Sequence, residues 1–318
     1  MYRENITRYS NSVIINSKFD NRLTNQFFYN ENLEENDKIN IITDVSKDRE
    51  INLIKGLYHR YPSKVLIFPT ERCLGSCRFC FRKNIIDSSD LSINEFNSVL
   101  AYIKEHDKIN EVIFSGGDPF AINIDLLLSM IMEVSKLESV KIIRIHTRVL
   151  TYCPELITEY FINKLKSINK TLFMVFHINS HLELTEYAIE KVNRLTNSGI
   201  LCFSQTALLK GVNDNVIDLK KLFENLIENK IKPYYLFHPD RVKGTGHFYI
   251  PLKKGIELYN NLYNYISGLA MPIYLFNIPN GYGHCIVDLG NINLIENNTY
   301  KIHTWDNNEL IYNDISYE

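Results

Sequence analysis

Residues 64–80 read KVLIFPTERCLGSCRFC, and this stretch decides how the rest of the chain is interpreted. It begins with KVLIF (64–68), a short apolar run that predicts a buried strand. Three cysteines follow within eight residues, Cys73, Cys77 and Cys80, in a chain that has six cysteines in all. Two interpretations are open at this point: a disulfide with one spare thiol, or a metal centre that takes three protein ligands.

Composition narrows the class of protein. The chain has 318 residues, 45% of them hydrophobic and 23% charged, with a net charge of −2. The small net charge argues against nucleic-acid binding driven by phosphate neutralisation. The amino terminus lacks the apolar core of a signal peptide, and no apolar run approaches the ~20 residues of a membrane span. We therefore expect a cytoplasmic protein that binds neither nucleic acid nor membrane, where thiols stay reduced and a disulfide is disfavoured.

Further strand-like runs follow the first at regular intervals, and amphipathic stretches separate them. One of these stretches, residues 92–106, has helical periodicity and Ser92 as its expected N-cap. Alternating strands and helices predict a parallel α/β sheet with right-handed crossovers. Six or seven such units suggest a barrel or an open part of one. A doubly wound open sheet is the alternative, and periodicity alone does not separate the two. The predicted strands after the first lie at 111–115, 141–146, 171–177, 200–205, 232–238 and 272–277.

The ends of the chain depart from this repeat. Residues 1–55 are predicted to form a short helical or irregular segment, and residues 56–290 the α/β unit. Residues 291–318 contain TYKIHTW and ELIYN, which predict a terminal β-hairpin.

Polar residues collect where the predicted strands end. The three cysteines follow the first strand and SGGDP (115–119) follows the second. HTR, HIN, SQT and HPD then close the next four strands in turn. Because parallel α/β folds bind their ligands at the carboxyl ends of the strands, these residues predict an active site at that face.

The spacing of the cysteines is the most specific signal. Three thiolates suit a [4Fe–4S] cluster with one iron left open, or a zinc site that awaits a fourth ligand. The second Cys-x2-Cys half that zinc sites usually have is not found. The pattern C-x3-C-x2-C, with Phe79 directly before the last cysteine, resembles the signature of the radical S-adenosylmethionine (SAM) enzymes. That resemblance implies a cluster whose open iron binds SAM, and a 5′-deoxyadenosyl radical as the product of SAM cleavage.

Several further blocks resemble one branch of that superfamily, the lysine 2,3-aminomutase family. They are GLYHRYPSKVLIFPTERC, FSGGDPF, RIHTR, QTALLKGVND, PYYLFHPD and IPLKKGIEL. The resemblance runs from about residue 50 to the end of the chain. It implies a partial (β/α)6 barrel of the TIM type. In the aminomutases, pyridoxal phosphate (PLP) holds the substrate amino group as an imine while that group migrates.

The resemblance also implies roles by position. Cys73, Cys77 and Cys80 hold the cluster, Arg82 binds a substrate carboxylate, and Arg60 and Lys64 fall where two arginines bind the PLP phosphate. Asp240 and Asn277 fall where the lysine-specific enzymes have two acidic residues. The positions that correspond to the SAM site are Phe79, Gly116, Gly117, Asp118, Arg148, His177 and Gln205.

The chain departs from the family at the PLP site. The PLP lysine follows a glycine-rich run after the last barrel strand. Here that run reads PNGYGHC (279–285), and the lysine position falls on His284. An imidazole cannot form the Schiff base that tethers PLP. No lysine lies between Lys254 and Lys301, so a shift of register does not supply one.

We therefore predict a divergent radical SAM enzyme that abstracts hydrogen from an amino-acid-like or peptidyl substrate without PLP. The outcome would be elimination, oxidation, decarboxylation or epimerisation, with His284, Cys285 or Asp240 as candidate proton or hydrogen donors. An external electron donor of the flavodoxin or ferredoxin type and a homodimer are expected by resemblance. The alternatives are an aminomutase that binds PLP non-covalently and a non-enzymatic iron–sulfur protein.

Overall fold

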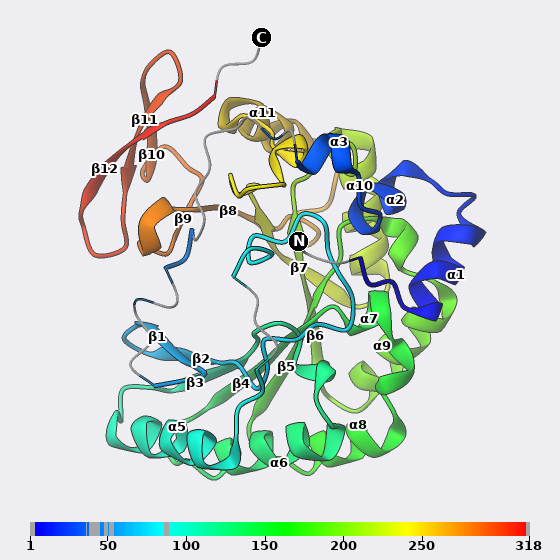
Figure 1. Cartoon of the computed structure of the whole chain (residues 1–318), viewed down its shortest axis with the longest axis vertical. Coiled ribbons are helices and arrows are strands. Elements are labelled where there is room, and N and C mark those ends of the chain that lie inside the picture. Colours follow the sequence, from blue (N-terminus) through cyan, green and yellow to red (C-terminus); the bar gives the residue numbers. More distant parts are fainter. Residues whose placement is uncertain are drawn as a thin grey trace.

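The structure is a computed structural model that describes residues 4–35, 37, 45–47, 50, 54–85 and 89–315. Residues 38–44, within the predicted amino-terminal segment, lie outside the described residues. A strongly curved nine-stranded sheet wraps around an interior that faces the viewer in Figure 1. A separate three-stranded sheet lies beside its last strands.

The strands of the large sheet follow one another in chain order. Neighbouring strands from β2 to β8 are parallel, while β1 and β9 close the two edges as antiparallel partners. The strands are β1 (Leu57–Tyr61), β2 (Lys64–Ile67), β3 (Glu111–Phe114), β4 (Ile142–Thr147), β5 (Thr171–His177), β6 (Leu201–Ala207), β7 (Ile231–Phe237), β8 (Ile273–Asn277) and β9 (His284–Ile286). All seven predicted strands are present. The antiparallel edges β1 and β9 were not predicted.

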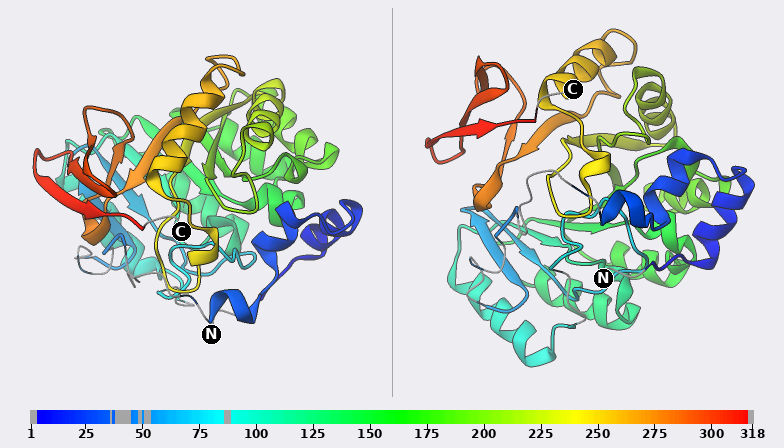
Figure 2. Two further views of the ribbon diagram at one scale, coloured as in Figure 1. Left: turned by 90° about the horizontal axis from the view of Figure 1, so that it is seen from above. Right: turned by 45° about the horizontal axis from the view of Figure 1, so that its top comes forward.

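Helices cover only the outer, convex face of the sheet (Figures 1 and 2). The six units from β2 to α11, followed by β8, confirm the partial (β/α)6 barrel. They exclude the doubly wound sheet, which carries helices on both faces. The covering helices are α5 (Ile93–Glu105), α6 (Ile124–Ser135), α8 (Glu159–Lys166), α9 (Glu186–Asn197), α10 (Val216–Glu228) and α11 (Leu252–Tyr263), with the short α7 (Val149–Tyr152) after β4.

Helix α5 illustrates why these stretches fold as helices. Ser92 and Glu95 form a reciprocal capping box at its start, as the predicted N-cap requires. Phe96, Val99 and Ile103, at spacings of three and four, are buried against the sheet.

Strand alternation decides which side chains reach the interior. In β6, Gln205 and Ala207 line the central pocket, whereas Cys202 on the opposite face belongs to the core beneath the helices. The same period of two turns Arg144 and His146 of β4, and Tyr235 and Phe237 of β7, towards the pocket.

Both ends of the chain pack against the barrel. The amino-terminal helices α1 (Arg8–Asn16) and α2 (Asn21–Phe27) lie beside α7, α9 and α10, and α3 (Glu31–Glu34) packs against the short segment Gly246–Phe248 before α11 (Figure 1). The predicted terminal hairpin is present as β11 (Thr299–His303) and β12 (Glu309–Asn313), and β10 (Ile292–Glu296) adds an unpredicted third strand. A small apolar core joins this sheet to β8, β9 and α11. Within the described residues, no helix is long and apolar enough to cross a membrane.

Candidate functional site

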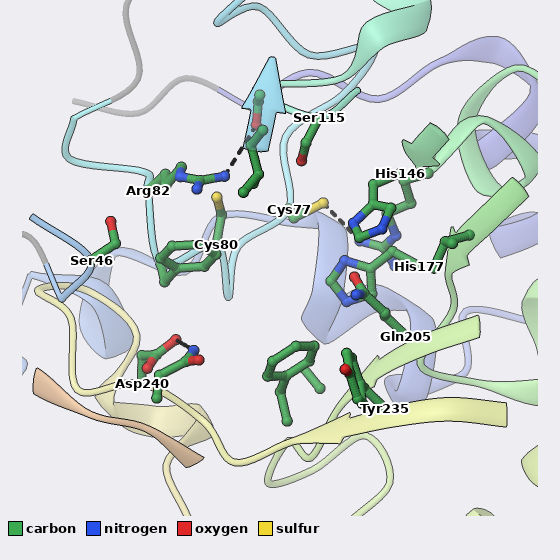
Figure 3. Close-up of a pocket in the computed structure, with 18 of the residues that line it drawn as sticks. Ser46, Cys77, Cys80, Arg82, Ser115, His146, His177, Gln205, Tyr235 and Asp240 are labelled. Atoms are coloured by element: carbon green, nitrogen blue, oxygen red, sulfur yellow. Dashed lines mark hydrogen bonds between the residues drawn. The ribbon is translucent and has the colours of Figure 1, made fainter. Parts of the chain in front are cut away.

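A cavity of about 360 Å³ lies inside the curve of the barrel (Figure 3). Its volume falls within the range of small-molecule sites. Every site residue predicted from the sequence lines it, except Cys285. The predicted residues that it brings together are Arg60, Lys64, Cys73, Cys77, Phe79, Cys80, Arg82, Gly116, Gly117, Asp118, Arg148, His177, Gln205, Asp240, Asn277 and His284.

The three cysteines occupy the loop after β2, with reduced and partly accessible thiols. Burial, together with the neighbouring thiols, raises the pKa of Cys73, and burial raises the pKa of Cys80 to about 11. Binding to iron would favour the thiolates that burial disfavours. No group of three or more metal-ligating side chains converges on a single point among the described residues. Each thiolate of an iron–sulfur cluster binds its own iron, so the donor set fits a cluster without such convergence.

Arg148 holds the Cys77 sulfur from the barrel side. Its Nη1 donates to Cys77 Sγ at 2.8 Å (Figure 3), and the Tyr152 hydroxyl lies 3.2 Å from the same sulfur. Its Nη2 donates to Gln26 Oε1 at 2.6 Å and to Glu183 Oε2 at 3.0 Å. Burial lowers the pKa of Arg148, but the nearby Cys77 and Glu183 outweigh burial and leave it raised. A guanidinium held through both of its terminal nitrogens therefore contacts one of the three cysteines that are expected to bind the cluster.

The amino-terminal segment clamps the cysteine loop. The Arg78 backbone N–H donates to Gln26 O at 2.9 Å. Glu34 accepts from Arg78 Nε at 2.7 Å and Nη2 at 2.5 Å, and from Lys83 Nζ at 2.6 Å. Burial raises the pKa of Glu34, but Arg78 and Lys83 outweigh it and hold that pKa below its usual value. Burial lowers the pKa of Lys83 in spite of the contact, so Arg78 is the firmer partner.

The two glycines of SGGDP allow the loop after β3 to pack against the cysteine loop. Gly116 has φ +115°, and a Cβ atom there would lie 2.4 Å from the Thr70 carbonyl oxygen. A Cβ atom at Gly117 would lie 2.0 Å from the Arg72 carbonyl oxygen. Any larger residue would push the two loops apart.

Asp118 holds this arrangement from within. It is 4% exposed, and burial raises its pKa to about 6. Its carboxylate accepts from Thr147 Oγ1 at 2.8 Å, from the Arg148 backbone N–H at 2.8 Å and from the Phe120 backbone N–H at 3.0 Å. The place of Asp118 in the SAM site stays a prediction, and in this structure the chain itself already occupies the carboxylate.

His177 and Gln205 are register partners on adjacent strands, so their side chains emerge side by side (Figure 3). The ring of Phe79 meets His177 edge-on, with centroids 5.4 Å apart. Burial and the charge of Arg148 lower the pKa of His177 to about 3, which keeps the imidazole neutral.

His146 is a pocket residue that sequence reasoning did not single out. It points into the cavity from β4 (Figure 3), and burial holds its pKa well below the usual value. Its Nε2 atom is buried and has no hydrogen-bond partner in the described part of the chain. The signal was present in HTR, the polar triplet that ends its strand.

The expected substrate residues lie close together. Arg82 lies over the rings of Phe68 and Phe81, with 4.7 Å to each centroid. Asn277 Nδ2 donates to Asp240 Oδ2 at 3.0 Å. Burial raises the pKa of Asp240 to about 7, although Asn277 and Arg82 oppose the shift. A guanidinium and a half-buried carboxyl thus line the same pocket.

His284 and Cys285 separate at β9. His284 pairs with Asn277 of β8 and faces the pocket, where its ring meets that of Tyr61 with centroids 5.6 Å apart. Burial and three nearby cations lower the pKa of His284 to about 4. Strand alternation turns Cys285 the other way, into the core shared with the carboxy-terminal sheet. This placement gives no support to Cys285 as a hydrogen donor.

Comparison with known proteins identifies the relatives of this chain. The model of the radical SAM superfamily matches residues 67–223. A putative L-lysine 2,3-aminomutase from Aquifex aeolicus is 36% identical over 79% of this chain and 68% of its own length. The L-lysine 2,3-aminomutase of Methanococcus maripaludis is 35% identical over 75% of this chain and 55% of its own length.

The chain therefore spans about half to two thirds of the length of these curated relatives. A solved radical SAM methyltransferase from Sphaerobacter thermophilus shares the fold, with a TM-score of 0.51 at 14% identity over 69% of this chain and 68% of that one. With the cysteine loop, the curved half-barrel and the pocket in place, these similarities show that the chain belongs to the lysine 2,3-aminomutase family of radical SAM enzymes.

Proposed function

We propose that this enzyme uses SAM and a [4Fe–4S] cluster to abstract hydrogen from an amino-acid-like substrate without the help of PLP. The observation that carries the proposal is His284, which faces the pocket at the position of the family's tethering lysine. Among the described residues that line the pocket, the one lysine is Lys64, which lies at the amino-terminal end of β2 and not after the carboxyl end of a strand. Cys73, Cys77 and Cys80 would hold the cluster, which in its reduced state would supply the electron for cleavage of SAM to the radical that takes the hydrogen.

The residues of the chain then bind and orient the substrate. Arg82 would hold the α-carboxylate, and Asp240 in its ionised form would hold the α-ammonium. His284 is neutral near pH 7, because its pKa of about 4 lies well below that value. It can therefore accept a proton at an imidazole nitrogen, as a weak base, when the substrate is oxidised or loses a group by elimination. Decarboxylation and epimerisation require no such proton acceptor.

The proposed chemistry requires an electron supply, and a cytoplasmic location is proposed together with it. The cluster needs an external one-electron reductant, for which a small cytoplasmic protein of the flavodoxin or ferredoxin type is the proposed source. The homodimer that the family suggests stays a prediction.

The second candidate is a 2,3-aminomutase that binds PLP without a covalent tether. Arg60 and Lys64, the positions expected at the PLP phosphate, both line the pocket and support this alternative. Relatives are named for lysine and also for glutamate, such as the glutamate 2,3-aminomutase of Clostridioides difficile, 32% identical over 70% of this chain and 53% of its own length.

The deciding experiment is anaerobic reconstitution of the cluster, then 5′-deoxyadenosine formation with SAM and reductant across a panel of amino acids, each with and without PLP. If an amino acid stimulates 5′-deoxyadenosine formation to the same extent with and without PLP, the proposal is supported. Turnover that requires PLP overturns it in favour of the aminomutase.

Trapping with borohydride checks the tether separately. Incubation with PLP followed by reduction should leave no phosphopyridoxyl group on a pocket residue. A stoichiometric adduct on Lys64, identified by peptide mass, would show that the tether has moved to β2 and would also overturn the proposal.

A further inference from the structure

A group of cations lines the pocket from β1, β2 and β4. Arg60, Lys64 and Arg144 all lie close enough to His284 to lower its pKa. Tyr61 links the group, because its hydroxyl lies 3.4 Å from His284 Nδ1 and its ring lies 4.6 Å beneath Lys64 Nζ. The pocket thus has a positively charged wall that the cysteine loop does not form.

Two cations of this wall share one carboxylate. Arg144 Nε lies 2.6 Å from Glu111 Oε1, and this pair is largely buried. Lys64 is the register partner of Glu111 but forms no ion pair of its own within the described ranges; burial and Arg144 lower its pKa, and Glu111 only partly opposes them. The pocket's carboxyl groups among the described residues are those of Asp118 and Asp240. Asp118 is held by Thr147 and Arg148, so it does not offset Lys64.

The wall is also set apart from the SAM residues. Lys64 begins β2, whereas the cysteines follow the end of that strand. The three residue steps of β2 span roughly 10 Å. Lys64 pairs in register with Glu111 at the start of β3, while Gly116 and Gly117 follow the end of β3. A ligand at Lys64 therefore need not compete with SAM.

A half-buried ammonium that shares its one nearby carboxylate with an arginine is costly, unless a ligand supplies further negative charge. A carboxylate or a phosphate monoester is the group that Lys64 and Arg60 would hold by charge-assisted hydrogen bonds. If PLP is not used, that negative charge has to come from the substrate. This step rests on the PLP-independent function proposed above.

We propose that the substrate is an amino acid with a second anionic group, a carboxylate or a phosphate monoester, which binds to Lys64 and Arg60. Its α-carboxylate and α-ammonium bind to Arg82 and Asp240. The substrate therefore spans the pocket from Arg82 and Asp240 to the cationic wall, and its reacting carbon lies between these two anchors.

The test compares anionic amino acids with their neutral isosteres on the reconstituted enzyme, without PLP. Glutamate and 2-aminoadipate probe a carboxylate, O-phosphoserine probes a phosphate, and glutamine and serine are the neutral controls. At least one anionic member should stimulate 5′-deoxyadenosine formation about tenfold or more over its neutral isostere, equivalent to ~1.4 kcal/mol. Lys64→Gln should remove that preference, while Lys108→Gln, at an exposed lysine, should keep it.

A binding measurement provides a readout that does not depend on turnover. Inorganic phosphate and glutarate should each raise the thermal midpoint of the cluster-loaded protein. Lys64→Gln should weaken the binding of each anion, with a Kd about tenfold higher. If glutamine matches glutamate and Lys64→Gln changes neither readout, this inference is wrong while the PLP-independent function stands. If anionic amino acids react only when PLP is added, and Lys64→Gln abolishes PLP binding, the wall holds the cofactor phosphate and both proposals fail.

Discussion

The two ends of the pocket are built on different principles. Around the cysteine loop, the charged and polar side chains contact one another, as in the chain from Gln26 and Glu183 through Arg148 to Cys77. Around His284, Arg144 and Lys64 share the single carboxylate of Glu111 among the described residues, and Lys64 lies over the ring of Tyr61. The first end is preorganised for one fixed cofactor set. The second end awaits a charged ligand, so changes there should alter which molecule binds rather than whether the chemistry occurs.

The largest expected effect is at the cysteine loop. Cys77→Ala should remove a cluster ligand and leave Arg148 without its sulfur acceptor. Iron content and cluster absorbance after anaerobic reconstitution should fall, and 5′-deoxyadenosine formation should drop below detection. Cys285→Ala is the matched control, since that thiol packs in an apolar core away from the pocket. Equal iron content in wild type and Cys77→Ala would contradict the ligand assignment.

The next effect concerns the clamp formed by the amino-terminal segment. Glu34→Gln leaves Arg78 and Lys83 buried without a full counter-charge, which should cost about 3–5 kcal/mol of unfolding free energy in denaturant titrations. The exposed neighbour Glu35 provides the control variant Glu35→Gln.

The pH dependence of this effect has a definite sign. Since the folded pKa of Glu34 is lowered, its stabilisation is complete above the unfolded pKa of about 4.3 and is lost as pH falls through the folded value. The stabilities of wild type and Glu34→Gln should therefore begin to converge as pH falls below about 4.3, and the difference should be lost below the folded pKa of Glu34. A difference that stays constant from pH 7 to pH 3 would argue against an ionised Glu34.

A smaller effect should follow from Gln26, a positioning residue that is fully buried. Gln26→Leu removes the acceptor that orients Arg148 and should reduce activity by about 10- to 100-fold. Because hydrogen bonds to cluster sulfurs help to set the potential, the cluster should become harder to reduce, with a midpoint lower by roughly 59 mV for a tenfold change. Redox titration followed by electron paramagnetic resonance measures this shift.

The control for Gln26 is its exposed neighbour, Asn25→Leu. A loss of activity in Gln26→Leu with an unchanged midpoint potential would mean that Gln26 acts on folding alone and not through Arg148.

The strands and their polar ends could be predicted because both depend on local patterns. Apolar runs of four to seven residues marked β2 to β8, and the residues that close them include His177, Gln205 and Asp240. The sequence alone could not predict which side chains of β9 face the pocket, because a strand of three residues is too short to show an alternating pattern. His284 and Cys285 therefore looked equivalent, and only the pairing of β9 with β8 separates them.

The supporting residues could not be predicted for a different reason. Gln26 and Glu183 meet Arg148 across sequence separations of 122 and 35 residues. Glu34 reaches Arg78 across 44 residues. The contacts of Gln26 and Glu34 depend on how the amino-terminal helices dock on the barrel, and the contact of Glu183 depends on how the segment after β5 packs against the segment after β4. No local motif encodes either arrangement. Buried polar residues in such a segment are recognisable only once their burial is known.

The smallest expected effect lies at Asp240, which is proposed to bind the α-ammonium group of the substrate. Since its pKa is about 7, the carboxylate form that binds an ammonium group becomes dominant as pH rises from 6 to 8. Substrate affinity should therefore improve by up to about tenfold over that interval, and Asp240→Asn should bind more weakly with a flat pH profile. Competition binding of the substrate at several pH values measures this slope, and Asp107→Asn, at an exposed aspartate, should keep the wild-type profile. If Asp240→Asn retained the slope, the ammonium would have to bind elsewhere, and Asp240 would serve only to hold the Asn277 side chain at the end of β8.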